Sequence, residues 1–175
     1  MTFTLRLIAI AAFGLLAGGS AAFAQPTPPT LLGTSEAWEA YKTEDTNNKR
    51  GAVCYAVTQP QTKEPAAAKR DQIYFLITTW PKAGIKNEPS VVIGYEFKPQ
   101  SDATVEIGSD KFKFFTKADG AWLREPTDEA RLIAAMRGSS EMTVKGMSKR
   151  GTLTTDTYSL KGLSVTLDKV VEGCK

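Results

Sequence analysis

Short apolar runs with a period of two, each ending in a turn signal, occupy most of this chain and limit it to few architectures. The segment DQIYFLITTW, from Asp71 to Trp80, carries apolar residues on both faces, which is typical of a central strand. The segments SVVIGYEF, ATVEIG and KFKFFTK alternate in the same way. The sequence therefore predicts a mainly β fold, an antiparallel β-sandwich or flattened barrel of about eight or nine strands with two short helices.

The first of these helices is expected near residues 127–137. Pro126 suits a helix start, Asp128 and Glu129 suit the positive end of the helix dipole, and Gly138 suits the other end. The segment EAWEAYKT, residues 36–43, fits either a helix or a strand. It is best interpreted as one half of a hairpin, with the polar turn DTNNKRG and the strand-like AVCYAVTQP following it. Three residues of the helix near 127–137 are expected to pack inward: Leu132, Ile133 and Met136.

The N-terminus has the form of a secretory signal peptide. Arg6 precedes an apolar run from Leu7 to Leu16, and residues 22–24, Ala-Phe-Ala, have the small-x-small form of a cleavage site. We expect cleavage after Ala24. The alternative is a membrane anchor, but the run is shorter than the roughly 20 apolar residues that cross a bilayer.

The chain then divides into three parts. Residues 1–24 are the expected signal peptide, 25–34 a flexible proline-rich lead-in segment, and 35–175 one β-rich domain. The product is expected in the periplasm or outside the cell, with no transmembrane segment after signal cleavage.

Two cysteines, Cys54 and Cys174, are the only ones in the chain. An even count in an exported protein predicts a disulfide, and one pairing is possible. Closing a loop of this length is worth about 4–5 kcal/mol in the chain-entropy account. Two free buried thiols are the alternative. The second helix is expected over residues 163–173, and Cys174 falls on its apolar stripe, which comprises Leu163, Leu167, Val170, Val171 and Cys174.

Composition removes several classes of function. The chain has 22 Lys and Arg against 19 Asp and Glu; without Arg6 the mature charge is +2, which is too small to indicate a nucleic-acid partner. The chain contains no histidine, which excludes His-based triads and His-ligated metals. We therefore predict no catalytic, cofactor-binding or metal-binding residues, no cofactor, and no enzyme activity.

The stretch RGTLTTDTYSLKG, residues 150–162, concentrates hydroxyl groups. It is best interpreted as a strand, with Thr155, Thr157 and Ser159 on one face. A ligand-contacting strip and a catalytic role stay open as alternatives. For a Ser or Thr nucleophile, the nearby bases are Lys145, Lys149 and Lys161. The carboxylates available for a glycosidase pair are Glu36, Glu39, Glu96, Glu106, Asp119 and Asp156. The tryptophans that could stack on sugars, or pack in the core, are Trp38, Trp80 and Trp122.

The order of several segments resembles the invasion-associated locus B family of alphaproteobacteria. These segments are EAWEAY leading to CYAVTQP, then DQIYFLITTW, NEPSVVIGYEF and FKFFTKADGAW, and finally TTDTYSLKG with an apolar helix and the last cysteine. The ending Ser159-Leu160-Lys161-Gly162-Leu163 is similar to the family's Ser-Leu-x-Gly-Phe. Other branches carry a further cysteine pair in mid-chain, which is absent here, so the resemblance is to a divergent branch.

The resemblance implies a periplasmic or secreted β-rich domain without known catalytic residues. The main hypothesis is an exported interaction module that binds an unknown protein or envelope component. The alternative, which rests on the resemblance alone, is a secreted or surface virulence or adhesion factor that promotes host-cell invasion.

Overall fold

The computed structural model describes residues 28–44 and 51–175. The predicted signal peptide, its cleavage site after Ala24 and most of the DTNNKRG turn lie outside these residues. Thr30 already belongs to the first strand, so the later part of the predicted lead-in segment 25–34 is strand.

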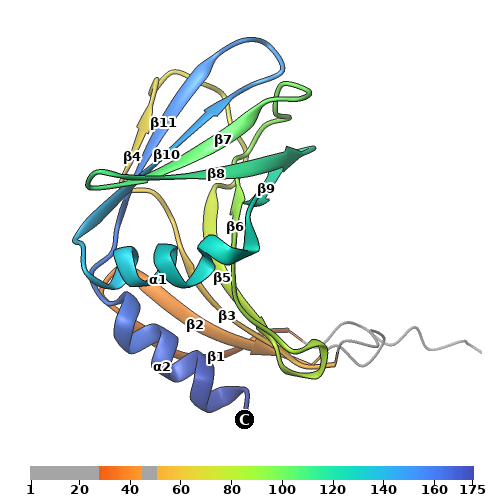
Figure 1. The fold of residues 1–175 in the computed structure, drawn as a ribbon, viewed down its shortest axis with the longest axis vertical. Coiled ribbons are helices and arrows are strands. Elements are labelled where there is room, and N and C mark those ends of the chain that lie inside the picture. The colour runs from red at the N-terminus through yellow and green to blue at the C-terminus, as the bar shows by residue number, and fades with distance from the viewer. Residues whose placement is uncertain (1–27, 45–50) are drawn as a thin grey trace, which may run out of the picture.

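The described residues form one antiparallel sheet of eleven strands (Figure 1). The strand order is β1-β2-β3-β5-β6-β9-β8-β7-β10-β11-β4. The strands are β1 (Thr30–Ser35), β2 (Trp38–Thr43), β3 (Val53–Thr58), β4 (Thr62–Glu64), β5 (Tyr74–Trp80), β6 (Ile85–Val92), β7 (Asp102–Ile107), β8 (Asp110–Lys117), β9 (Gly120–Leu123), β10 (Glu141–Met147) and β11 (Leu153–Ser159).

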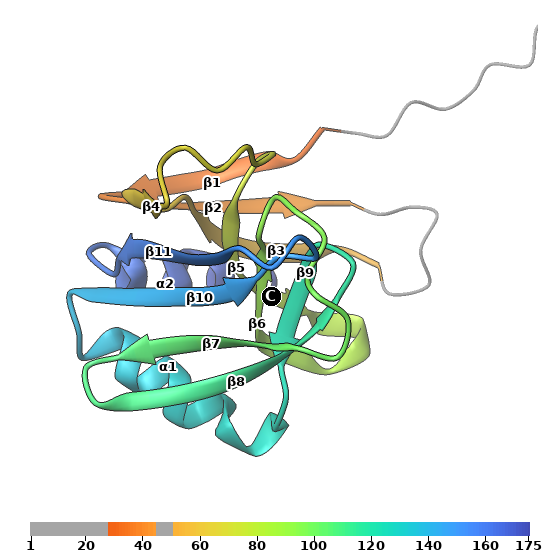
Figure 2. The same ribbon diagram turned by 90° about the horizontal axis from the view of Figure 1, so that it is seen from above.

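The sheet coils so that its two halves face each other, but it does not close, because β1 and β4 are the two ends of the strand order. Figure 2 shows β11, β10, β7 and β8 as the nearer layer, with β3 and β5 behind it. The predicted mainly β, antiparallel architecture is confirmed. The count exceeds the eight or nine strands expected, because the two edge strands, β1 and the short β4, carry little apolar alternation.

The core lies between the two halves. The Phe75 ring of β5 lies 6.0 Å from that of Tyr158 in β11 and 6.3 Å from that of Phe114 in β8. Trp38 of β2 donates from Nε1 to the carbonyl oxygen of Ser159, at 2.9 Å. These contacts join strands that are far apart in the sequence, so the inward residues of both halves form one core.

Two helices accompany the sheet. A 3₁₀ turn, η2 (Pro126–Asp128), leads into α1 (Glu129–Arg137), which buries Leu132, Ile133 and Met136 as predicted. Helix α2 (Leu163–Gly173) has the predicted bounds and lies against β1, β2 and β3 (Figure 1). Among the residues placed by the structure, no helix has the length and hydrophobicity needed to cross a membrane.

The predicted stripe of α2 needs one correction. Leu163, Leu167 and Val170 are buried, but Val171 is 55% exposed and Thr166 takes the inward place on the other flank. At about 100° per residue, Val171 lies about 80° around the helix from Leu163, and this places it at the solvent edge.

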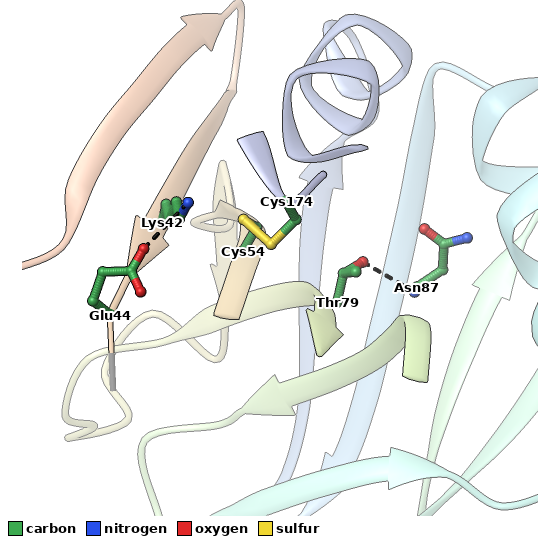
Figure 3. Close-up of a disulfide and its surroundings, with 6 residues drawn as sticks. All are labelled: Lys42, Glu44, Cys54, Thr79, Asn87 and Cys174. Atoms are coloured by element: carbon green, nitrogen blue, oxygen red, sulfur yellow. Dashed lines mark hydrogen bonds and ion pairs between the residues drawn. A yellow bond between two sulfur atoms is a disulfide. The ribbon is translucent and has the colours of Figure 1, made fainter. Parts of the chain in front are cut away.

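The predicted disulfide is present. Cys54 of β3 is bonded to Cys174, directly after α2, with Cα atoms 5.9 Å apart (Figure 3). At the other end of the helix, Gly162 permits the chain to lie close to Ser35 of β1. Its φ is +90°, and a Cβ there would lie 2.0 Å from the carbonyl oxygen of Ser35. The helix is therefore attached to the sheet at both ends.

The connection after β5 is shorter than its composition indicates. PKAGIKNEP, residues 81–89, contains the Pro, Gly and Asn typical of turns, but only the 3₁₀ turn η1 (Pro81–Ala83) and Gly84 turn the chain. Strand β6 begins at Ile85. A register irregularity between Thr78 and Trp80, and a positive φ at Asn87, let the strand continue through a polar sequence that lacks regular alternation.

Candidate functional site

The hydroxyl-rich stretch forms β11, so its interpretation as a strand is confirmed. Thr154, Asp156 and Tyr158 point into the core and are buried. Thr155 and Thr157 face outward, between the neighbouring strands β10 and β4. The stretch therefore has its most polar buried residue, Asp156, on the inner face.

Asp156 forms an ion pair with Arg70, a residue that the sequence analysis did not single out. The Arg70 Nη1 and Nη2 atoms each lie 2.6 Å from one carboxylate oxygen of Asp156. Nε and Nη2 also donate to the carbonyl oxygen of Ile93. The two side chains are 4% and 0% exposed. Taking two charges out of water costs several kcal/mol per ion, and bidentate geometry offsets that cost. Both carboxylate oxygens of Asp156 are therefore hydrogen-bonded to Arg70.

The other predicted carboxylates are dispersed over the molecule. Glu106 accepts from Lys145 at 2.7 Å and pairs with Lys111, and these bonds lower the pKa of Glu106. Glu96 pairs with Lys149 at 2.8 Å. Glu39 accepts from the Tyr41 hydroxyl, Glu36 lies in the β1–β2 turn, and Asp119 lies in the β8–β9 turn. In the described ranges, no three His, Cys, Asp or Glu residues gather as metal ligands would.

The three tryptophans have different environments. Trp38 is fully buried in the core. Trp80 ends β5 and is half-buried. Trp122 lies on the outer face of β9 and stacks on Phe115 of β8, with ring centroids 5.7 Å apart and planes at 27°. Phe115 is 40% exposed. The pair is adjacent because Trp122 is the register partner of Phe115 on one side and of Ser90 on the other.

These two rings line a cavity of about 800 Å³, which we call the aromatic cleft. It is bounded by the start of β6, by β8 and β9, and by the segment leading into α1. Its apolar lining comprises Ile85, Pro89, Phe115, Trp122, Leu123 and Pro126, and its charged lining comprises Lys86, Glu88, Lys117, Arg124 and Glu129.

The Trp122 indole lies across Gly120. A Cβ at Gly120 would be 2.4 Å from Cη2 of Trp122, so only glycine leaves the space that the ring occupies. The indole thus contacts the backbone of β9 and adjoins the Phe115 ring on the neighbouring strand. The floor of the cleft is therefore aromatic and consists of two adjoining rings.

The charges around the cleft have both signs. Burial raises the pKa of Glu129, and the nearby charge of Glu88 raises it further. Arg124 is paired with Asp102. Lys86 and Lys117 form no ion pair with any residue that the structure describes. The cleft thus presents two carboxylates and two uncommitted ammonium groups above an apolar floor. Sequence reasoning missed Glu88 and Glu129, because they lie 41 positions apart and neither follows a motif.

One comparison with known proteins gives a match. A family model described as "Invasion associated locus B (IalB) protein" matches residues 38–171, which include β9, the aromatic cleft and most of α2. No curated protein and no solved structure matches the chain.

Proposed function

This chain belongs to the invasion-associated locus B family, and from that premise we propose that it is an exported, non-enzymatic interaction module that binds a protein or envelope component. Its place would be the periplasm or the cell exterior. The Cys54–Cys174 disulfide supports this location, because such bonds persist in oxidising compartments. The proposal divides the chain into a signal peptide (1–24), a lead-in segment (25–34) and one domain (35–175).

The aromatic cleft is the observation that carries the proposal. Phe115 is exposed and Trp122 partly exposed, and the two rings lie in a stacked arrangement on the surface of the sheet. Exposed aromatic residues are enriched in binding sites, and prior ordering lowers the entropy lost on binding. A cavity of about 800 Å³ lies within the range of about 300–1,000 Å³ that is typical of ligand sites.

Binding is favoured over catalysis because most of the candidate carboxylates and lysines are held in ion pairs. The chain has no histidine to act as a general base. Asp156, Glu106 and Glu96 are engaged by Arg or Lys. Lys145 and Lys149 are the partners of two of these carboxylates, which disfavours them as bases for a Ser or Thr nucleophile.

The test is retention of envelope material by the purified mature protein. Wild type, Trp122→Ala and Phe115→Ala would be immobilised and exposed to detergent-solubilised envelope from the native host. The matched control is Tyr41→Ala, because Tyr41 stacks on Tyr55 at 5.6 Å on the outer face of β2 and β3, away from the cleft. We expect the two cleft variants to lose the retained material and the control to keep it. Equal retention by all four proteins would contradict the proposal.

The alternative function is a secreted or surface virulence or adhesion factor that promotes host-cell invasion, and its support is the family match. Fractionation and cell binding separate the two. The proposed module requires a partner in the bacterial envelope, whereas the alternative requires saturable binding of the purified protein to host cells. Export itself is checked by N-terminal sequencing of the fractionated protein, which is expected to begin at Gln25.

A further inference from the structure

We propose that the aromatic cleft binds an uncharged glycan chain. This inference rests on the proposed function and names the chemical class of the envelope component. Three features of the cleft carry it: the shape of its floor, the mixture of donors and acceptors at its rim, and the balance of its charges.

The floor is suited to a sugar ring. The outer end of the Trp122 indole covers Gly120, and the Phe115 ring adjoins it with its centroid 5.7 Å away and its plane at 27°, so the two rings form one apolar patch in the lining of the cleft. A pyranose has C–H groups on its two faces and hydroxyl groups around its edge. Its face can therefore pack on an aromatic surface while its edge stays available for hydrogen bonds.

The rim offers hydrogen-bonding groups of both kinds. Glu88 and Glu129 are acceptors, and Lys86 and Lys117 are donors without ion-pair partners in the described residues. The indole N–H of Trp122 also makes no hydrogen bond within the described part of the chain. A sugar hydroxyl donates and accepts at once, so a chain of hydroxyls can satisfy both kinds of group.

The balance of charge disfavours other ligand classes. Two carboxylates oppose two ammonium groups, and Arg124 is neutralised by Asp102. Neither an acidic nor a basic ligand gains net electrostatic attraction from such a rim. A purely apolar segment would remove Glu88 and Glu129 from water without replacing their hydrogen bonds, which is costly. A neutral polyhydroxylated ligand avoids both penalties.

The size of the cleft favours an oligosaccharide. Its volume of about 800 Å³ lies in the upper part of the range for small-molecule sites. The charged residues lie on β6, on β8, at the start of α1 and, for Arg124, in the segment after β9, so contacts to more than one sugar ring are needed to reach all of them.

The experiment uses the oxidised mature chain and three neutral probes: cellotetraose, maltotetraose and the tetramer of N-acetylglucosamine. Tetragalacturonate is the anionic comparison. Binding is measured by calorimetry and by saturation-transfer NMR. We expect at least one neutral probe to bind with saturation transfer concentrated on its ring C–H protons, and tetragalacturonate to bind at least about tenfold more weakly than that probe.

Variants locate the site. Trp122→Ala is expected to weaken binding of that probe by at least about tenfold, the loss typical of removing an aromatic anchor. Gly120→Ala keeps every charged group of the cleft but displaces the indole, so it is also expected to weaken binding of the probe. Tyr41→Ala is expected to bind as wild type does. Melting temperatures of the variants show whether each one is folded.

The outcomes separate this inference from the proposed function. Glycan binding that is unchanged in Trp122→Ala would overturn the assignment to the cleft. If no neutral probe binds at millimolar concentration while envelope material is still retained through Trp122, the glycan class is wrong and the interaction module stands. If retention is also independent of Trp122 and Phe115, both proposals fail.

Discussion

Arg70 and Asp156, 86 positions apart in the sequence, form a bidentate ion pair inside the sheet, with both N–O distances at 2.6 Å. Arg70 belongs to the connection between β4 and β5, and Asp156 to β11. The same guanidinium donates to the carbonyl oxygen of Ile93 after β6 and lies over the Tyr95 ring, 5.1 Å from its centroid. One side chain thus joins the two halves of the coiled sheet.

Removal of Asp156 is therefore expected to be costly. Asp156→Ala leaves the buried Arg70 charge without a partner, and we expect the free energy of unfolding to fall by about 3–5 kcal/mol. The measurement is chemical denaturation. The control is Glu96→Ala, which breaks the exposed pair with Lys149 and should cost less than about 1 kcal/mol. The double variant Arg70→Met/Asp156→Leu should recover part of the loss, because no buried charge remains.

Two glycines with similar backbone conformations allow the cost of backbone strain to be measured apart from the cost of a steric contact. Gly162 and Gly151 have φ values of +90° and +86°. A Cβ at Gly162 would meet the carbonyl oxygen of Ser35 at 2.0 Å, whereas at Gly151 nothing lies within 4 Å. Gly151→Ala should cost only the conformational term, about 1–2 kcal/mol. Gly162→Ala should cost clearly more in the same denaturation experiment. Equal costs would show that the contact with Ser35 is readily relieved.

The disulfide is expected to hold α2 on the sheet. A helix of 11 residues is marginal alone, and Cys174 lies at its end. Reduction, or Cys174→Ala, should lower stability by about 2–5 kcal/mol and expose Leu163, Leu167 and Val170. Thermal melting with and without reductant measures the loss. Val171→Ala, on the exposed edge of α2, is the control and should change little. An unchanged melting temperature after reduction would mean that packing alone retains the helix.

Two glutamates are expected to change stability with pH in opposite directions. Burial, followed by the charge of Glu88, raises the pKa of Glu129, so its charged form is disfavoured in the folded state. Stability associated with Glu129 is therefore present below the unfolded pKa of about 4.3 and lost as pH rises through the folded value. Glu129→Gln should then be slightly more stable than wild type at pH 7 and equal to it at low pH.

Glu106 provides the opposite case. Hydrogen bonds from Lys145 and then Lys111 lower the pKa of Glu106, so its stabilising effect is present above the unfolded pKa and lost as pH falls through the folded value. Glu106→Gln should be less stable than wild type at pH 7, and the difference should vanish in acid. Unfolding curves of the two variants from pH 3 to pH 7 test both signs. A difference of the same sign for both variants would contradict these assignments.

The aromatic cleft shows why the candidate site was not predictable. Alternation places Phe115 on one face of its strand and Phe114 on the other, but it does not say which strand lies beside β8. Trp122 reaches Phe115 through a short hairpin, whereas Glu88 and Glu129 come from β6 and α1. Arg70 gave no signal either, because it lies in a loop and its partner is 86 positions away.

The sequence by itself determined what depends on neighbours along the chain. The period of two predicted the strands, and the period of 3.6 with its end residues predicted α1 and α2. The cysteine count left one pairing, Cys54 with Cys174. Tertiary structure alone decided the open eleven-stranded sheet, the outward position of Trp122 and the pairing of Arg70 with Asp156. The physical reason is that local periodicity shows which residues share a face, while the order of the strands decides which faces meet and which remain in water.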